Sequence, residues 1–373
     1  MKISQLLNKG KKSVALLILI SFLVGFAAGV LGTFYYVEYI DQKEPTPIVD
    51  SSKISIHFPE LGNKYTGDCT YIKAGDTDIL IDAGSRRSSI SEICDYIDRY
   101  VTDKKLEYVI VTHAHEDHYA GFATNESTDS IFDLYDIGTV IDFSITNHER
   151  DAVMYGNYLR ELDDAIDRGA KHYTAAQCVQ TGKDSFDLGD GIELRILDSF
   201  FYYNKTSSEN NYSVCVLISN GGENYLFTGD LESEGEAYLV KMNDLPRVTL
   251  YKAGHHGSKT SSTDTLLSVI RPEYVCVCCC AGSSEYTDNI KNQFPTQDFC
   301  DRIAKYTDRV YVTTLCTDYK ADKFTSFNGD IIFSSGADGH GIECSGFTGV
   351  LCESDWFKKN RTCPENWRKK AAA

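Results

Sequence analysis

One short segment of the sequence, VTHAHEDHYAG at residues 111–121, concentrates side chains that bind divalent metals well. Three of the chain's nine histidines lie within six consecutive positions there, together with two acidic residues. Imidazole nitrogens and carboxylate oxygens are good ligands for divalent cations. Since so short a loop cannot give all its ligands to one ion, we expect His113 and His115 to hold one cation. Asp117 and His118 would then hold a second, unless the loop is only a polar loop rich in histidine.

Three further segments place polar residues at the end of an apolar run. The run NYLF leads to Gly229 and Asp230, where a carboxylate can bridge two cations and the glycine lets the backbone come close. The segment LYKAGHHGSKTS supplies His255 and His256, one as a ligand and the other as a group that contacts substrate or orients a ligand. The segment DILIDAGS ends with Asp82, which could orient the metal-binding loop or form a turn before glycine.

The elements that must position these residues follow from the spacing of apolar side chains. Apolar runs of strand length occur at residues 54–58, 70–74, 78–84, 108–113, 139–143, 193–198, 213–219, 224–230, 248–254, 274–280, 309–315 and 330–334. Patterns of helical period occur at residues 88–101, 152–168, 232–242, 263–270 and 296–306. The mixture predicts an α/β arrangement of sheets covered by helices, with functional residues on the loops that leave strand ends.

The first 52 residues predict a membrane anchor and a linker. Residues 14–37 carry no charge, and about 20 apolar residues suffice to cross a bilayer as a helix. Lysines precede this segment and acidic residues follow it, which predicts a cytoplasmic basic N-terminus at 1–12, a transmembrane signal anchor at 13–37 and a linker at 38–52. We therefore expect a single-pass protein of the cell membrane with its catalytic domain extracellular. A cleaved signal, giving a secreted form, is the alternative.

The composition limits the partners and the use of cysteine. A formal net charge of −17 repels polyanions, so nucleic acid is not the partner that charge favours. Thirteen cysteines is an odd number, and the four in YVCVCCC lie in a continuous apolar run, which favours small buried hydrophobes over a metal site. Cys344, Cys352 and Cys363 are the better candidates for a disulfide.

Together and in this order, the four motif segments resemble the metallo-β-lactamase superfamily, whose mark is the HxHxDH motif at residues 113–118. They are also similar to the extracytoplasmic hydrolase domain of the competence protein ComEC and its stand-alone relatives, through the stretches at 66–84, 112–121, 209–232 and 250–262. The resemblance implies a four-layer αββα metallo-β-lactamase sandwich at 53–335, preceded by one N-terminal transmembrane helix. A C-terminal extension at 336–373 has no assigned function.

The resemblance also implies a set of site residues. The implied metal ligands are His113, His115, Asp117, His118, Asp230 and His256, with Asp117, Asp230 and His255 as the catalytic groups and Asp82 and Asn211 as supporting groups. His255 and His256 could exchange roles. The implied cofactors are two divalent cations, Zn²⁺ in the first place and Mn²⁺ as the alternative.

Two departures from the family pattern affect the site. Many members have a further histidine where this chain has ENNYSV at residues 209–214, so we expect the first cation to be held less tightly. Phe294 stands where relatives often have histidine, which predicts an altered substrate pocket. The remaining histidines match no motif: we expect His148 and His172 on the surface, and His57 and His340 in structural or exposed positions.

The implied activity is metal-dependent hydrolysis. A water shared by two divalent cations has its pKa lowered from 15.7 toward about 7, which supplies hydroxide at neutral pH. The ComEC-like pattern implies a phosphodiester substrate, either a small molecule or an envelope polymer, with nucleic acid as a further candidate. The alternatives are a lactam or lactone hydrolase and a catalytically inactive metal-binding module of the envelope. The sequence sets no oligomeric state.

Overall fold

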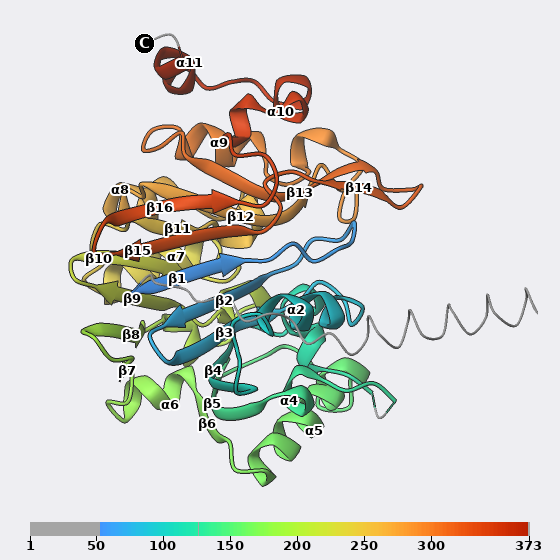
Figure 1. Ribbon diagram of the computed structural model, residues 1–373, viewed down its shortest axis with the longest axis vertical. Coiled ribbons are helices and arrows are strands. Elements are labelled where there is room, and N and C mark those ends of the chain that lie inside the picture. The colour runs from blue at the N-terminus through green and yellow to red at the C-terminus, as the bar shows by residue number, and fades with distance from the viewer. Residues whose placement is uncertain (1–52, 126, 372–373) are drawn as a thin grey trace, which may run out of the picture. The chain divides into compact units, whose positions relative to one another are not determined.

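The structure is a computed structural model that describes residues 53–125 and 127–371 (Figure 1). The strands of these ranges form two eight-stranded sheets. The first has the order β16-β15-β1-β2-β3-β4-β5-β6. Its strands are β1 (Ile54–Phe58), β2 (Cys69–Ala74), β3 (Thr77–Ala83), β4 (Lys105–Val111), β5 (Asp136–Asp142), β6 (Lys171–Thr174), β15 (Ile331–Gly336) and β16 (Gly339–Cys344).

The second sheet has the order β14-β13-β12-β11-β10-β9-β8-β7. Its strands are β7 (Ser185–Asp187), β8 (Ile192–Ile196), β9 (Val216–Asn220), β10 (Glu223–Phe227), β11 (Leu250–Lys252), β12 (Tyr274–Ala281), β13 (Val310–Asp318) and β14 (Lys323–Ser326). Each sheet contains a parallel stretch, β3 to β6 in the first and β10 to β13 in the second. Parallel neighbours bring their carboxyl ends to one edge, where the motif loops leave the sheets.

Helices cover the outer face of each sheet. Buried side chains of α2 (Ser89–Ile97), α4 (Ile131–Leu134) and α5 (Val153–Asp167) pack in one apolar cluster with the first sheet. Those of α7 (Ser233–Met242), α8 (Asp264–Ile270) and α9 (Gln297–Ile303) pack in a second cluster with the second sheet. The result is a four-layer α/β sandwich, which confirms the predicted two-sheet architecture.

Several shorter elements connect or flank these layers. The remaining helices are α3 (Glu116–Tyr119), α6 (Ala175–Gln180), α10 (Asp355–Asn360) and α11 (Glu365–Ala371). The 3₁₀ turns are η1 (Ala120–Phe122), η2 (Phe200–Tyr202), η3 (Glu209–Tyr212), η4 (Gly254–Gly257), η5 (Ile290–Asn292) and η6 (Leu351–Glu353). Strand β16 pairs with β15, so the chain adds a strand to the first sheet after residue 335.

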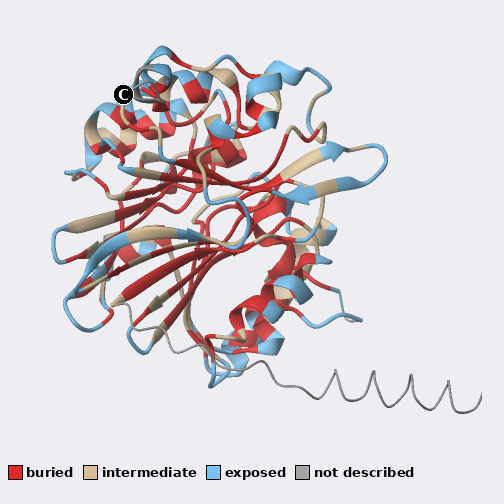
Figure 2. Ribbon diagram, turned by 45° about the horizontal axis from the view of Figure 1, so that its top comes forward, coloured by how far each residue is buried: buried red, intermediate tan, exposed pale blue. Residues whose placement is uncertain are grey.

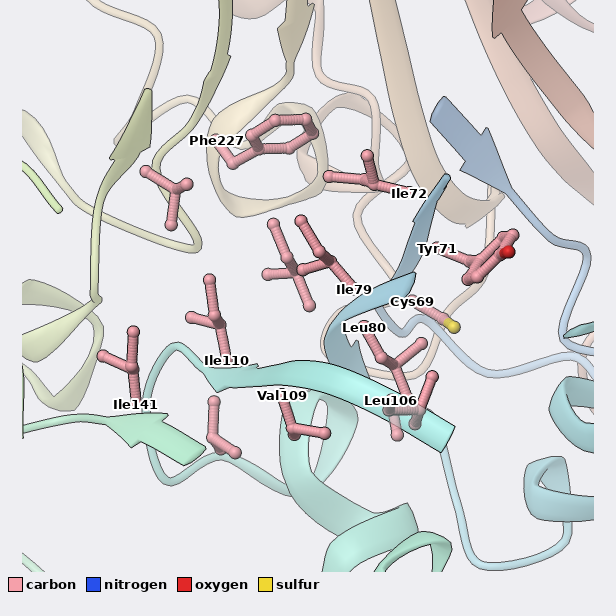
Figure 3. Packing of buried hydrophobic residues seen from close by; sticks show 14 of the residues in the cluster. Cys69, Tyr71, Ile72, Ile79, Leu80, Leu106, Val109, Ile110, Ile141 and Phe227 are labelled. Carbon is pink, nitrogen blue, oxygen red and sulfur yellow. The ribbon is translucent and has the colours of Figure 1, made fainter. Parts of the chain in front are cut away.

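The main core lies between the two sheets. Phe227 of β10 faces Ile72 and Ile79 of the first sheet (Figure 3). Burial is concentrated in the strands, while exposed residues gather at loops and strand ends (Figure 2). This distribution follows from strands that are covered on both faces, because alternate side chains point to opposite sides of a sheet.

Strand β12 shows why its cysteines are buried. Cys276 and Cys278 belong to the cluster between the sheets, whereas Val275, Val277 and Cys279 belong to the cluster under the helices. Burial raises the pKa of the Cys276 thiol well above its usual value, so the group is a neutral thiol. These cysteines therefore act as small apolar side chains on both faces of a central strand. All thirteen cysteines lie in the described ranges and are free, including the three disulfide candidates Cys344, Cys352 and Cys363.

In the two described ranges, no helix has both the length and the apolar character needed to cross a membrane. The predicted anchor at residues 13–37 and the linker at 38–52 lie outside those ranges. The anchor and the extracellular location therefore remain predictions.

Candidate metal centre

The loop after β4 brings the histidines of the HxHxDH segment together. His113 Nε2 lies 3.0 Å from His115 Nδ1, and α3 begins at Glu116. The imidazoles of His113 and His118 pack with their centroids 4.2 Å apart. Gly84 of the DAG segment allows this loop to pack against β3, because a Cβ atom there would lie 1.7 Å from the carbonyl oxygen of Asp117.

Four buried side chains converge from three loops: Asp117, His118, Asp230 and His256. Asp230 Oδ2 lies 3.2 Å from His118 Nε2 and 3.3 Å from His256 Nε2. His256 Nε2 also lies 3.4 Å from Asp117 Oδ2. The loops that deliver Asp230 and His256 follow the adjacent parallel strands β10 and β11. The strand order of the second sheet therefore places the two residues side by side.

The backbone is strained at this point. His255 and His256 adopt φ values of 48° and 52°, and Gly229 before Asp230 adopts a φ of 51°. Left-handed conformations at two consecutive non-glycine residues cost free energy, and such strain tends to gather at functional sites.

The donor atoms fit a divalent cation. His118 Nε2, His256 Nε2 and Asp230 Oδ1 are buried and have no hydrogen-bond partner among the described residues. Buried polar atoms are rarely left without a partner. In a tetrahedral shell with bonds of about 2.0 Å, two ligand atoms lie about 3.3 Å apart. This separation matches the 3.2 and 3.3 Å that separate the other carboxylate oxygen of Asp230, Oδ2, from His118 Nε2 and His256 Nε2. The chain thus has a candidate metal-binding cluster.

Asp68 and Lys252 belong to this centre, although the motifs did not predict them. Asp68, His118, Asp230 and His256 form a buried group whose potential ligand atoms all lie within 4.8 Å of one another. Asp68, however, faces the Nδ1 atoms of the two imidazoles, at 3.3 Å from His256 and 3.6 Å from His118. An ion bound by the Nε2 atoms would lie on the opposite side of both rings. We therefore place Asp68 behind the ligands, where it also forms a buried ion pair with Lys252 of β11.

Asp82, at the end of β3, supports the imidazole of His118. Its Oδ2 lies 2.8 Å from His118 Nδ1, and its carboxylate accepts hydrogen bonds from the backbone N–H of Thr112 at 2.8 Å and from the Thr112 hydroxyl at 2.7 Å. Such a partner fixes the tautomer and the orientation of a ligand histidine. His256 has the equivalent partner in the carbonyl oxygen of Cys278, 2.8 Å from its Nδ1.

His255 lies at the rim of the cluster rather than within it. Its Nε2 is 3.9 Å from Asp230 Oδ2, its Nδ1 is 3.1 Å from the Thr260 hydroxyl, and its side chain is 20% exposed. His256 is fully buried and much closer to the carboxylates, so the geometry favours His256 as the ligand and leaves His255 facing the approach to the site.

Asn211 and Ser213, from the segment ENNYSV, support Asp230 and the loop that follows it. The side-chain oxygen of Asn211 accepts from the backbone N–H of Glu232 at 3.1 Å, which holds the loop after Asp230. The Ser213 hydroxyl accepts from the backbone N–H of Asp230 at 3.0 Å and lies 3.4 Å from His113 Nδ1. Ser213 was not among the predicted site residues.

The pKa shifts divide the centre into two parts, with His113 in one and His118, His256 and Asp230 in the other. Burial and the neighbouring imidazoles of His118 and His115 hold the pKa of His113 well below its usual value. Burial would also lower the pKa of His118 and His256, but nearby carboxylates, above all that of Asp230, hold both pKa values well above the usual range. Burial alone would raise the pKa of Asp230, yet the same two imidazoles hold it well below its usual value.

An aromatic wall, which we define as Tyr286 and Phe294, lies over this centre. Both residues come from the loop between β12 and α9. The Tyr286 hydroxyl donates to Asp117 Oδ2 at 2.7 Å. The ring of Phe294 lies 5.5 Å from that of His255 and 5.9 Å from that of His256, between centroids. Phe294, which the sequence predicted to alter the pocket, thus contacts both histidines of the HHGS segment.

The remaining histidines contact other parts of the fold. His148 is exposed, as expected, whereas His172 is only partly exposed and its Nε2 lies 2.9 Å from Asp142 Oδ1. His57 is buried within hydrogen-bond distance of Tyr96 and Ser55. His340 Nδ1 lies 2.6 Å from Glu223 Oε1 and connects β16 to β10.

Two facing sheets covered by helices, with imidazoles and carboxylates gathered at one edge, have the architecture of the metallo-β-lactamase fold and a candidate metal-binding cluster. The family model described as "Metallo-beta-lactamase superfamily" matches residues 62–124, which include Asp68, Asp82 and the HxHxDH loop. This match confirms the resemblance predicted from the motifs.

The curated relatives are competence and recombination proteins that match over short stretches. The chain is 37% identical over 68 residues to Recombination protein 2 of Haemophilus influenzae and 34% identical over 67 residues to ComE operon protein 3 of Bacillus subtilis. It is 33% identical over 116 residues to Competence protein ComA of Neisseria gonorrhoeae. These stretches cover 18%, 18% and 31% of this chain and 8%, 9% and 15% of the three relatives.

Solved structures with a similar chain course include the metallo-beta-lactamase fold protein YhfI of Bacillus subtilis, at 12% identity and a TM-score of 0.39. That likeness covers 69% of this chain and 95% of the other. CmlA, a diiron beta-hydroxylase of Streptomyces venezuelae, is 12% identical with a TM-score of 0.36, over 63% of this chain and 46% of the other.

Proposed function

We propose that this chain is a membrane-anchored, extracytoplasmic phosphodiesterase that uses two divalent cations, Zn²⁺ in the first place and Mn²⁺ as the alternative. One observation carries the proposal. Asp117, His118, Asp230 and His256 converge from three loops, with three distances of 3.2 to 3.4 Å between imidazole Nε2 and carboxylate Oδ2 atoms. The Nε2 atoms of His118 and His256 have no hydrogen-bond partner among the described residues, which supports their role as ligands.

A divalent cation held by these residues supplies Lewis-acid chemistry, because it lowers the pKa of a water toward about 7 and polarises a phosphoryl oxygen. The chain's own residues supply the orientation. Asp230 and Asp117 each keep one carboxylate oxygen toward the cluster, where it can accept a hydrogen bond from a water. His255, which is partly exposed at the rim, can donate to an anionic oxygen of the substrate.

The phosphodiester assignment draws support from the relatives and from charge. The matched relatives are named as recombination and competence proteins, and the bond that joins nucleotides is a phosphodiester. The net charge of −17 opposes strong binding of long nucleic acid. A small phosphodiester or a phosphodiester of an envelope polymer therefore suits this chain better than long DNA.

The test compares three substrates on the full chain in detergent, loaded with Zn²⁺ or Mn²⁺. Bis-p-nitrophenyl phosphate, single-stranded DNA and nitrocefin are assayed with the wild type, with Asp117→Ala and with His172→Gln. We expect phosphodiester turnover that is lost in Asp117→Ala and kept in His172→Gln, whose imidazole contacts Asp142 instead. Turnover of nitrocefin alone would establish the lactam alternative. Metal binding without turnover of any substrate would indicate the inactive envelope module.

A further inference from the structure

The loop that carries the aromatic wall, residues 282–296, is closed at its base. The backbone N–H of Gly282 donates to the carbonyl oxygen of Phe294 at 2.8 Å, and the backbone N–H of Thr296 donates to that of Gly257 at 2.9 Å. The second bond joins the loop to the HHGS turn. The position of the aromatic wall over the metal centre thus depends on how this loop is held.

One side chain of the C-terminal segment, Arg361, holds the loop from outside. Arg361 follows α10 and is 8% exposed. Its Nε donates to the carbonyl oxygen of Pro295 at 3.0 Å, its Nη1 to that of Ile290 at 3.0 Å and its Nη2 to that of Gln293 at 2.7 Å. A fourth bond joins Nη1 to the carbonyl oxygen of Asn360 at 2.9 Å.

The four hydrogen bonds of Arg361 all end on backbone carbonyl groups. Burying a guanidinium is costly unless its donors are satisfied, and its five N–H groups form a rigid fork. Here the fork reaches three carbonyl groups within six residues of one loop, Ile290, Gln293 and Pro295. These bonds end on backbone carbonyl groups rather than on a carboxylate. They therefore hold the backbone of the loop in place, in addition to satisfying the N–H groups of the guanidinium.

Neighbouring residues of the same segment hold both ends of the loop. Trp356 of α10 lies against Gly282, where an added Cβ atom would meet its Nε1 at 2.5 Å. Thr362 and the Gln297 side chain exchange two hydrogen bonds, at 2.8 and 2.9 Å. In Figure 1 α10 lies beside α9, the helix that follows the loop. The C-terminal segment therefore braces the loop at its beginning, at its end and through Arg361.

The wall that is braced in this way lies beside the metal centre and is partly open to solvent. Tyr286 bonds Asp117 through its hydroxyl, yet the residue is 57% exposed, so much of its ring is open to a ligand. Tyr286 and Phe294 pack together with centroids 5.8 Å apart. Two adjacent aromatic rings beside a metal centre form a surface on which a flat apolar group can stack.

We propose that the C-terminal segment at residues 345–371 shapes the substrate site by bracing the loop at residues 282–296. Arg361 is a positioning residue that holds the aromatic wall, and the wall favours phosphodiesters that carry an aromatic or other flat apolar group. This inference rests on the proposed phosphodiesterase function for its substrate and adds a role for a segment outside the motif-bearing region.

The kinetic test uses Arg361→Gln in the metal-loaded full chain, with Arg368→Gln as the matched control. Arg368 lies on the same segment and donates to Cys363, away from the loop. For bis-p-nitrophenyl phosphate we expect Arg361→Gln to raise KM about tenfold with kcat within about threefold, because binding rather than the chemical step is lost. For methyl p-nitrophenyl phosphate, which has one aromatic group fewer, the rise in KM should be smaller. Arg368→Gln should match the wild type with both substrates.

Hydrogen exchange tests the brace without relying on activity. Amides of residues 282–296 should exchange faster in Arg361→Gln than in Arg368→Gln, while the metal content stays the same. If the wild type cleaves no phosphodiester, the proposed function fails, but this measurement still decides whether Arg361 holds the loop. Unchanged exchange and unchanged KM in Arg361→Gln would overturn the inference, and so would loss of metal, which would assign the segment to the metal centre.

A second variant covers the case in which Arg361→Gln does not fold. Phe294→Leu keeps an apolar side chain at the wall and leaves the arginine in place. We expect it to reduce the preference for bis-p-nitrophenyl phosphate over the methyl ester about fivefold or more, as expected for the loss of one aromatic contact. An unchanged preference would contradict the role of the wall even if the loop is held as described.

Discussion

The two halves of the metal centre both take histidines from the loop after β4 but are supported differently. The first half contains His113 and His115, and the groups near His113 Nδ1 are the hydroxyls of Thr112 and Ser213, at 3.2 and 3.4 Å. In the second half, His118 is backed by the carboxylate of Asp82. The carboxylate supplies a stronger, charge-assisted partner than a hydroxyl at that distance.

The number of carboxylates also differs between the halves. Asp117 and Asp230 both approach the Nε2 atom of His256 in the second half, and Asp68 lies behind its imidazoles. Carboxylates attract a divalent cation, and partners behind the ligands reduce the reorganisation needed to bind it. The comparison therefore predicts that the second half binds its cation tightly, while the first half binds more weakly.

The largest effect is expected from removing a ligand of the second half. His118→Ala deletes the Nε2 donor beside Asp230, so we expect the loss of the tightly held cation and a decrease in kcat of about 10³-fold or more. Elemental analysis and steady-state kinetics measure the two effects. If His118→Ala retains a full complement of metal, the assignment of the second half is wrong.

Removing a ligand of the first half should have a smaller effect. His115→Ala leaves Asp117, His118, Asp230 and His256 in place, so we expect one equivalent of metal to remain and kcat to fall about a hundredfold. The loss of both cations from this variant would show that the halves are not independent. The matched control is His172→Gln, which removes an imidazole that contacts Asp142.

Changing the support of the second half is the next test. Asp82→Asn keeps the shape of the side chain but removes the charge beside His118 Nδ1, and loss of such a partner typically costs 10–100-fold in metal affinity. Competition with a fluorescent chelator measures the affinity. Only the tightly bound cation should be affected; a weaker affinity of both cations would mean that Asp82 acts on the whole loop.

The two halves should also respond differently to pH. In the metal-free chain the pKa of His118 is raised above the usual value and that of His113 is lowered. A proton must leave His118 before its nitrogen binds a cation, so affinity at the second half should fall as pH decreases through that raised pKa, by up to about tenfold per pH unit. Affinity at the first half should change less over the same range. Calorimetry in buffers of different ionisation enthalpy counts the protons released.

The strands and helices that were predicted from sequence are those with long apolar patterns. The run YVCVCCC corresponds to β12, and the helical pattern at residues 152–168 to α5. Strands β6, β7, β14 and β16 were not predicted; each lies at the edge of its sheet, and the first three are only three or four residues long. Their sequences contain few apolar residues, so their pairing is set by the neighbouring strand rather than by their own pattern.

The site was predictable where the spacing of its residues is diagnostic. The HxHxDH motif places three imidazoles in one loop. The segments after β10 and β11 lie beside that loop because parallel neighbouring strands end at the same edge of a sheet. Asp68 and Lys252 were missed, since single charged residues in TGDC and LYK carry no such spacing. A lysine inside an apolar strand was the available signal, because a buried charge requires a partner. The contact of Arg361 with three carbonyl groups has no sequence pattern, so only the structure reveals it.

The smallest expected effect concerns the serine that joins the two halves. Ser213→Ala removes the acceptor of the Asp230 backbone N–H and the hydroxyl near His113 Nδ1, while the methyl group fits the same space. Loss of one neutral hydrogen bond costs about 1 kcal/mol, so we expect a decrease in first-half metal affinity of about fivefold. Second-half affinity should change less, because Asp82 and Asp68 support that half independently of Ser213. An equal decrease in both affinities, measured with the same competing chelator, would show that Asp230 transmits the change to both cations and that the halves form one cooperative site.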